Sequence, residues 1–296
     1  MNLRFSGHET FVVRTFWPKK GYDFVSSGGN FNNENAVVGL GVGKNMVSSI
    51  QHWMRALSLL NEKNELSELS HFLFGEAGVD PFLEDIGSIW LLHYHLIKTN
   101  YASIYSAIFN KFRKERSSFT KIQLNNFVKR LYRENDDARY NPQSVDKDIS
   151  VFIRLYNTPD YKIIKNDFEE EVSGLMLELE LLSSTFEDVH FERGKRKEEW
   201  FHLNAGNRPE LPSLITLFTI LDQNSDSSAI SFRRLEVEDN NPGLVFLLSK
   251  DGLYYQLKQI ESIMDGVIVS ETAGVINLIL PQNLNKWEIL RKYYGN

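Results

Sequence analysis

The sequence predicts an α+β protein that is mainly α with small β wings: winged-helix or helix-turn-helix modules at the N-terminal and C-terminal ends surround a helical middle region. A hydrophobic fraction of 42% with 24% charged residues is typical of a globular chain. Apolar residues recur mostly at helical spacing, and two β-rich runs stand near the C-terminus. Because 296 residues suffice for two or three domains, we expect an N-terminal DNA-binding domain (1–97), a basic helical region (98–165) and an acidic C-terminal domain (166–296).

The net charge of −6 hides an asymmetry along the chain. Residues 1–165 carry 21 Lys and Arg against 17 Asp and Glu, whereas residues 166–296 carry 12 against 22. Basic charge is densest over residues 98–133, where nine Lys and Arg accompany the single acid Glu115. Binding to a polyanion depends on local potential, so a net acidic charge does not exclude DNA. The acidic C-terminal half favours a protein partner.

Residues that are absent exclude several classes of protein. The chain contains no Cys, which excludes disulfides, thiolate catalysis and a zinc–cysteine site. No stretch approaches 18 uninterrupted apolar residues, and Met1–Ser6 contains no apolar signal core. We therefore expect a cytoplasmic protein with no membrane partner.

The N-terminal module is predicted over residues 33–57, where a short helix, a glycine-rich turn and a longer helix follow in order. At about 100° per residue, one arc of the longer helix is apolar. It comprises Met46, Val47, Ile50, Trp53, Met54 and Leu57. The other side comprises Lys44, Asn45, Ser48, Ser49, Gln51, His52 and Arg55. This polar side has no acid, and its donors suit phosphates and base edges. DNA docking is therefore favoured over a solvated face, with Lys44 beside the N–H groups of the helix start.

The glycines of this turn do not form a nucleotide site. Val38 stands where a phosphate-binding loop needs its first glycine, and Asn45 stands where that loop needs a hydroxyl. Lys44 occupies the last glycine position of a dinucleotide fingerprint. No nucleotide cofactor is expected.

The middle region is predicted to contain helices over residues 104–114, 120–134 and 143–155. On the second helix the expected apolar anchors are Ile122, Leu124, Phe127, Val128 and Leu131. Lys121, Lys129 and Arg133 point outward on the same helix and are a second candidate DNA surface. A solvated basic face without a ligand is as consistent with this pattern.

The acidic region is predicted to hold helices over 170–182 and 211–222 and a final hairpin from the runs 266–269 and 275–280. Asp251 with Gln256 and Lys258 nominally fits a restriction-type nuclease. Apolar residues at helical spacing favour a helix there, whereas the nuclease needs a strand. Residues 231–280 therefore favour a second winged helix.

Two sets of residues are of the types that bind metals. His93 and His95 lie about 200° apart on one helix, so they cannot share an ion. Glu187, Asp188, His190 and Glu192 have ligand types that suit Mg²⁺. They precede the charge-rich run 193–199, which favours a solvated loop over a metal site.

A resemblance joins several of these features. The motif Gly7-His8-Glu9-Thr10-Phe11 is followed by Arg14, Trp17, Lys19-Lys20-Gly21, Gly39-Leu40-Gly41-Val42-Gly43-Lys44-Asn45-Met46-Val47, Ile50 and Trp53. Over residues 5–57 the chain resembles a bacterial family linked to DNA phosphorothioation and phage defence, the SspB-like nickase family. The resemblance implies double-stranded DNA, a sulfur-transfer enzyme and an ATPase as partners, with Mg²⁺ for any nicking of one strand.

The family motif makes His8 and Glu9 candidate catalytic residues of such a metal-dependent nickase, acting separately because the side chains of adjacent residues diverge. The favoured interpretation is structural: Glu9 pairs with Arg14 or Lys20, and His8 anchors the N-terminal arm. Arg14, Lys19 and Lys20 are expected to contact phosphates. The alternative function is a non-enzymatic winged-helix adaptor or transcriptional regulator that binds DNA and recruits an ATPase or sulfur-transfer enzyme.

Overall fold

The computed structural model describes residues 3–136, 139–158, 174–191, 194–225 and 227–295. The chain forms two compact units. Unit 1 comprises Met1–Ile108 and Phe112–Asn204, and unit 2 comprises Phe109–Lys111 and Ala205–Asn296. The predicted N-terminal and middle regions therefore share unit 1 with the first part of the acidic region. The described chain is mainly helical and carries two three-stranded antiparallel sheets, which confirms the α+β class.

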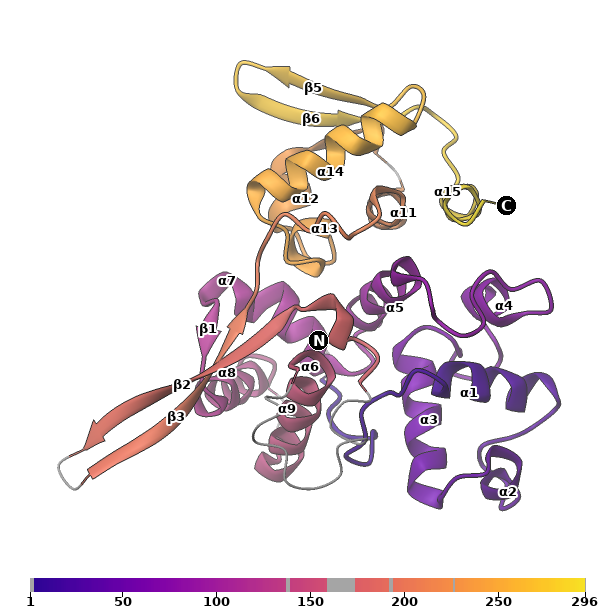
Figure 1. The fold of residues 1–296 in the computed structure, drawn as a ribbon, viewed down its shortest axis with the longest axis vertical. Coiled ribbons are helices and arrows are strands. Elements are labelled where there is room, and N and C mark those ends of the chain that lie inside the picture. The colour runs from indigo at the N-terminus through magenta and orange to yellow at the C-terminus, as the bar shows by residue number, and fades with distance from the viewer. Residues whose placement is uncertain (1–2, 137–138, 159–173, 192–193, 226, 296) are drawn as a thin grey trace. The chain divides into compact units, whose positions relative to one another are not determined.

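Unit 1 begins with an extended arm and five helices (Figure 1). They are α1 (Trp17–Ser26), α2 (Ala36–Leu40), α3 (Lys44–Ala56), α4 (Glu68–Phe74) and α5 (Ile86–Thr99). Gly41 ends α2 in the left-handed region, at φ 60°, and α3 starts three residues later. The short helix, glycine turn and longer helix predicted for this segment are confirmed. Gly21 lets α1 approach α3, because a Cβ there would lie 2.9 Å from the sulfur of Met54.

Further helices follow at sites the sequence predicts, and all of them belong to unit 1 except Phe109–Lys111, which belongs to unit 2. They are α6 (Ser103–Ser106), a π-helical stretch (Ala107–Phe112), α7 (Arg113–Glu115), α8 (Lys121–Glu134) and α9 (Pro142–Tyr156). Thr120 and Gln123 form a capping box at the start of α8, and Asn141 caps α9. Ile122 is an exception to the predicted anchoring, since 65% of it is exposed. The remaining predicted anchors of α8 are buried.

The two histidines of α5 make separate contacts, as their spacing predicts. Nδ1 of His93 lies 2.7 Å from the hydroxyl of Tyr156, and both side chains are buried. Nδ1 of His95 lies 3.2 Å from the hydroxyl of Ser58. These contacts fasten α5 inside unit 1.

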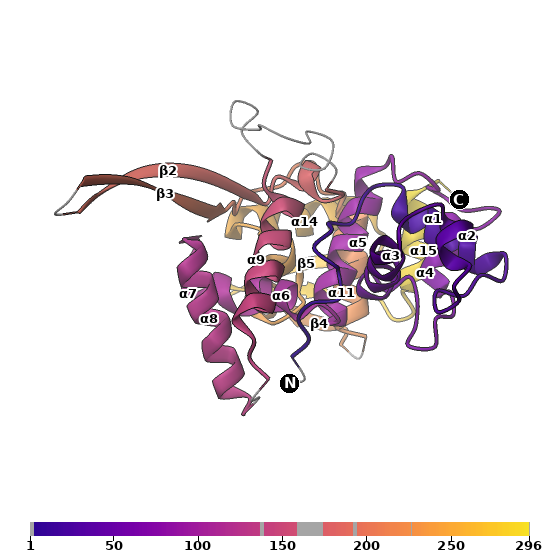
Figure 2. The same cartoon turned by 90° about the horizontal axis from the view of Figure 1, so that it is seen from below.

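A long hairpin is the feature of unit 1 that the sequence did not predict. β2 (Leu182–Phe191) pairs with β3 (Gly194–Leu203), which also pairs with β1 (Ser118–Phe119). The hairpin extends away from the helices as a two-stranded ribbon (Figures 1 and 2). The predicted loop over 193–199 is wrong, because Gly194–Leu203 forms the second strand. The predicted helix over 170–182 lies partly outside the described residues, and its described end contains only the 3₁₀ turn Leu177–Leu179 before β2 begins.

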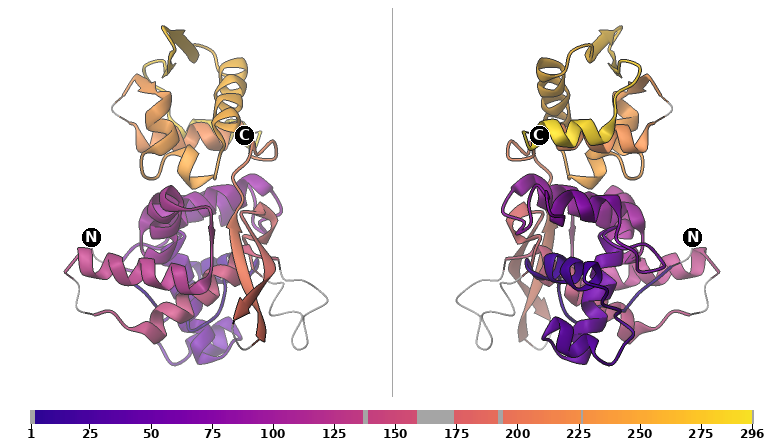
Figure 3. Two further views of the ribbon diagram at one scale, coloured as in Figure 1. Left: turned by 90° about the vertical axis from the view of Figure 1, so that its left-hand side faces the viewer. Right: turned by 90° about the vertical axis from the view of Figure 1, so that its right-hand side faces the viewer.

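Unit 2 alternates helices with a small sheet. Its elements are α11 (Ser213–Gln223), β4 (Ala229–Ser231), α12 (Phe232–Val237), α13 (Pro242–Val245), α14 (Lys250–Ile263), β5 (Ile268–Thr272), β6 (Val275–Ile279) and α15 (Lys286–Tyr293). The sheet order is β4-β6-β5. Ala273 and Gly274 both have positive φ, which is the two-residue turn that hairpins favour. The predicted final hairpin is therefore confirmed, and it projects at one end of this unit in gold (Figure 3).

The core of each unit is aromatic and aliphatic. In unit 1 the largest fully buried side chains include Trp53, Trp90, Tyr105 and Phe152. Unit 2 buries Phe218 of α11 and Leu257 of α14. None of the helices in the described ranges combines the length and apolar character needed to cross a bilayer.

Candidate nucleic-acid interface

The N-terminal arm lies against α3 and α9. Its backbone has positive φ at several residues that are not glycine, which is uncommon. Ser6, Glu9 and Thr10 all have positive φ, and Gly7 has φ 106°. A Cβ at Gly7 would lie 2.6 Å from Nδ1 of His52. Only glycine fits this close approach without displacing the imidazole. The strained backbone is held by contacts on both sides of the arm.

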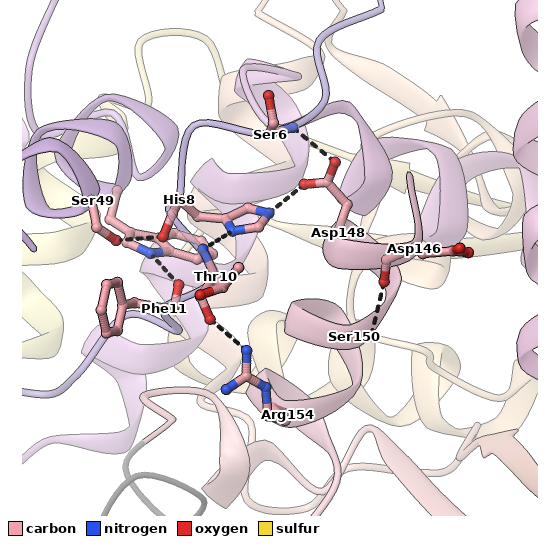
Figure 4. Close-up of polar contacts among 10 residues, drawn as sticks. Ser6, His8, Thr10, Phe11, Ser49, Asp146, Asp148, Ser150 and Arg154 are labelled. Carbon is pink, nitrogen blue, oxygen red and sulfur yellow. Dashed lines mark hydrogen bonds and ion pairs between the residues drawn. The ribbon is translucent and has the colours of Figure 1, made fainter. Parts of the chain in front are cut away.

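His8 is the buried centre of those contacts (Figure 4). Its Nδ1 accepts the backbone N–H of Thr10 at 3.0 Å, so the ring proton lies on Nε2. Nε2 then donates to Oδ1 of Asp148 on α9 at 2.5 Å. The other carboxylate oxygen of Asp148 accepts the backbone N–H of Ser6 at 2.8 Å. His8 and Asp148 therefore fasten the arm to α9.

Three further side chains hold the backbone of the arm. The hydroxyl of Ser49 on α3 donates to the carbonyl of His8 at 2.9 Å. Nε1 of Trp53 donates to the carbonyl of Phe11 at 3.1 Å. Arg154 of α9 donates to the carbonyl of Thr10. The family motif thus joins α3 to α9 through the arm, which is the anchoring role favoured for His8.

The polar side predicted for α3 is only partly available to a ligand. Ser49 and His52 are buried beneath the arm, so the prediction that they line a DNA-facing surface is wrong. Burial, together with the neighbouring His8, Arg4 and Arg55, lowers the pKa of His52 to about 3. The imidazole of His52 is therefore neutral near pH 7, and its Nε2 has no hydrogen-bond partner.

Arg55 also turns inward. Its Nε and Nη2 donate to Oδ1 of Asn64 at 3.1 and 2.7 Å, and its Nη1 donates to the hydroxyl of Tyr101 at 3.2 Å. These bonds use three of the five guanidinium N–H groups and hold the side chain against Asn64 and Tyr101. The exposed polar face of α3 is reduced to Lys44, Asn45 and Ser48.

The first turn of α3 retains the properties that attract an anion. Its N-cap is Gly43, which provides no side-chain cap, and the turn contains no acid. The N–H groups at a helix start carry partial positive charge and need acceptors. Lys44 and Asn45 are exposed beside them. The N–H groups of this turn can therefore donate hydrogen bonds to a phosphate oxygen.

The cations of the arm and α1 have local contacts. Nζ of Lys19 lies 2.5 Å from Oδ1 of Asp23, and Nζ of Lys20 donates to the carbonyl of Leu40 at 3.1 Å. The guanidinium of Arg14 lies over the ring of Trp17 at 5.5 Å. Glu9 is exposed. Its expected pairing with Arg14 or Lys20 stays a prediction.

The second predicted surface lies on α8. Lys121, Lys129 and Arg133 are all exposed, as the helical wheel predicts. The neighbouring Arg130 instead pairs with Glu115 and Glu134. The three exposed cations give α8 a basic side that can follow a phosphate backbone.

The predicted acidic cluster does not assemble in the described residues. Glu187 and Asp188 are neighbours on β2, so their side chains point to opposite faces of the hairpin. Glu187 lies opposite Glu198, and Asp188 lies opposite Lys197. The side chain of His190 and all of Glu192 lie outside the described residues. Within the described part of the chain no three His, Asp or Glu side chains are grouped to hold a metal, so no Mg²⁺ ligands are assigned.

The nuclease alternative for the C-terminal region is also wrong. Gln256 and Lys258 lie on α14 rather than on a strand. Oε1 of Gln256 accepts the hydroxyl of Thr216, and its Nε2 donates to the carbonyls of Arg208 and Leu211. Gln256 is therefore a buried structural residue that ties α14 to α11 and the preceding loop.

One feature of unit 1 was missed at the level of sequence. Phe16 and Phe82 are largely exposed and line one hollow with residues of α1 and α2. A single Phe in a sequence usually predicts a buried position. Phe16 and Phe82 are also far apart along the chain, so nothing in the sequence connects them. No sequence signal separates them from buried phenylalanines.

These features define a two-unit α+β protein whose first unit presents two exposed basic surfaces. The chain belongs to the family described as a protein of unknown function, DUF4007, which matches residues 5–294. Two solved structures are similar to the whole chain: a magnesium ion-bound SspB crystal structure, with a TM-score of 0.84, and an SspB crystal structure, with a TM-score of 0.83. Each is 26% identical, and the match covers 100% of this chain and 89% of the other. No curated protein matches. The predicted resemblance to the SspB-like family is confirmed.

Proposed function

We propose that this protein is a DNA-binding component of a bacterial DNA phosphorothioation or related phage-defence system. Similarity to SspB over the full chain supports the type of system. The exposed first turn of α3 carries the DNA-binding part of the proposal, because Lys44, Asn45 and Ser48 stand there without an acid. Donors at a helix start suit phosphate oxygens and base edges.

The basic side of α8 supports the same ligand. Lys121, Lys129 and Arg133 are exposed on unit 1, and each cation that neutralises a phosphate releases a counterion. Such contacts are independent of DNA sequence. They predict binding that weakens as salt is raised, with a slope of roughly 0.9 per phosphate contact.

The element order of unit 2 supports our interpretation of it as a winged helix. A helix, a strand and helices ending in α14 are followed by two strands, and the first strand pairs with the last. We assign unit 2 a role in contacting a protein. α14 exposes Asp251, Tyr254 and Tyr255, and aromatic side chains are frequent anchors at protein interfaces. An ATPase or a sulfur-transfer enzyme of the same system is the proposed partner, which makes the chain an adaptor.

Nicking of one DNA strand is the second candidate function. The observation that favours it is the similarity to an SspB structure that holds a magnesium ion. Mg²⁺ at such a site activates water and neutralises charge on the phosphate. Because His8 is bonded to Asp148 and Thr10, its proposed part in nicking is to hold the arm rather than to transfer a proton.

A supercoiled plasmid incubated with purified protein, with and without Mg²⁺ or Mn²⁺, separates the two candidates. Metal-dependent open-circular product would establish nicking. Intact supercoils together with salt-sensitive duplex binding would establish the adaptor. The absence of binding to duplex DNA at low salt would contradict the proposed function.

A further inference from the structure

A hollow of about 810 Å³ opens on unit 1 beside α1 and α2. Its lining includes Phe16, the N-cap of α1, Lys20 and Phe24 of α1, and Phe82 of the loop before α5. All of its residues lie between 16 and 82, so the hollow belongs to a single unit.

The exposure of two phenylalanines at one hollow requires an explanation. Phe16 is 66% exposed and Phe82 is 55% exposed, whereas most large aromatic side chains of this unit are buried. Val38, which also lines the hollow, is 81% exposed. Apolar surface that is gathered in one place on a soluble unit marks a binding site more often than scattered apolar residues do.

Two glycines make room for an aromatic ring in the wall of the hollow. The ring of Phe24 is so close to Gly29 and Gly39 that a Cβ at either would lie 2.6 or 2.8 Å from it. Both distances are too short for a real Cβ contact. The two glycines therefore allow the ring of Phe24 to lie in this wall, where it also meets Phe31 edge-on at 5.2 Å.

The polar lining identifies the kind of ligand. Lys19 and Lys20 bring two cations, and the amides of Asn30, Asn33 and Asn35 bring neutral donors and acceptors. Asp23 also lines the hollow and is paired with Lys19. Lys20 uses one donor on Leu40, and an ammonium has three. Aromatic faces, neutral amides and cations together match a base, its polar edge and its phosphate, whereas an apolar protein segment would leave the amides and cations unmatched.

We propose that this hollow binds an unpaired nucleobase of single-stranded DNA. The base stacks on Phe16 or Phe82, its edge meets the asparagine amides, and the adjoining phosphate lies at Lys20. This inference rests on the proposed function, in that DNA is the ligand of unit 1. It adds a preference for unpaired DNA that the α3 and α8 surfaces do not require.

The test measures binding of the full chain to a fluorescent oligonucleotide of thymidines and to a duplex. Phe16→Ala and Phe82→Ala are compared with Phe186→Ala, which removes a phenylalanine of similar exposure, 50%, from β2. We expect the Phe16 and Phe82 variants each to bind the oligonucleotide about 10-fold more weakly than the wild type does. The control variant should bind the oligonucleotide as tightly as the wild type, and all variants should bind the duplex as the wild type does. Abasic residues in the oligonucleotide should remove the difference between wild type and the Phe16 and Phe82 variants.

Replacing thymidine by 5-iodouridine adds a positional readout, since light should link the base to a peptide that contains Phe16 or Phe82. Equal oligonucleotide affinity of wild type and the Phe16 and Phe82 variants would overturn the proposal and leave a protein segment as the occupant. An equal loss of duplex and single-strand binding in these two variants would also overturn it. Failure of wild type to bind any DNA would contradict the proposed function as well, whereas duplex binding without oligonucleotide binding would contradict this inference alone.

Discussion

The helices α3 and α14 have nearly the same length and both start at an exposed lysine, Lys44 or Lys250, yet their first turns differ in chemistry. Gly43 leaves the N–H groups of α3 without a side-chain cap, and no acid follows. At α14 the hydroxyl of Ser249 accepts the N–H of Gly252, and Asp251 adds a negative charge. An open, acid-free helix start attracts an anion, whereas a capped acidic start does not. A similar helical frame can therefore serve two kinds of partner.

The two helices are also fastened by different means. α3 is covered by the arm, whose hydrogen bonds involve Ser49 and Trp53 of α3 and Asp148 of α9. α14 is held within unit 2 by Gln256. Both helices therefore depend on residues more than 40 positions away in the chain. The difference is that α3 is linked to α9 through a separate segment, the N-terminal arm, whereas Gln256 links α14 directly to the loop before α11.

The largest effect is expected for Asp148→Ala. The substitution leaves Nε2 of His8 and the N–H of Ser6 without their acceptor in a buried place. We expect a loss of about 3 kcal/mol in the free energy of unfolding, measured by urea denaturation. Asp146→Ala on the exposed side of α9 is the control and should cost less than about 1 kcal/mol. Equal losses in the two variants would contradict the anchoring role of His8 and Asp148.

The next effect is a pH dependence of the free energy of unfolding that comes from His52 of α3. Helix α14 contains no histidine and contributes no such dependence. The folded protein holds His52 neutral with a pKa of about 3, whereas the unfolded chain gives it a pKa near the usual 6.5. The unfolded state therefore binds more protons below pH 6.5, and the stability from His52 is lost as the pH falls from 6.5 toward 3. Between pH 7 and pH 5 the loss should be about 2 kcal/mol.

His52→Gln removes this titration. The free energy of unfolding of the variant, measured at pH 7 and pH 5, should fall by less than that of the wild type. If both proteins lose the same amount over this interval, His52 is not the buried neutral group described above.

Gln256→Ala tests the direct anchoring of α14 to the loop before α11. It removes the donor to the carbonyls of Arg208 and Leu211, and we expect a loss of about 1.5 kcal/mol by urea denaturation. Gln259→Ala, at a more exposed position of the same helix, should be close to neutral. A neutral Gln256 variant would show that α14 does not need its polar anchor.

The parts of this structure that sequence could predict depend on local periodicity. The helices α3, α8 and α9 follow from apolar spacing and caps, and the β5–β6 hairpin follows from two β-rich runs around a glycine turn. The hairpin β2–β3 was missed because the charged run after Phe191 is typical of a loop, although its backbone pairs along the whole length. The charged run lacks the alternation of apolar and polar residues that signals a strand, so its sequence favours a loop.

The candidate site shows the same limit. A helical wheel places Ser49 and His52 on the polar side of α3, and only the arm, more than 40 positions earlier, makes that side internal. The exposed residues Lys44 and Ser48 were predicted, because nothing distant covers them. Phe16 and Phe82 could not be recognised, since their exposure is set by the packing of α1, α2 and the loop before α5.

The smallest expected effect tests the central claim most directly. Duplex binding is titrated against salt for the wild type, Lys44→Ala and Lys250→Ala, which remove the first helical lysine of α3 and of α14. We predict that Lys44→Ala weakens binding by about 5- to 10-fold at low salt and lowers the salt slope by roughly 0.9, the loss of one phosphate contact. Lys250→Ala should change neither quantity. An unchanged salt slope in Lys44→Ala, or equal effects of the two substitutions, would contradict the assignment of the α3 helix start as the DNA-binding surface.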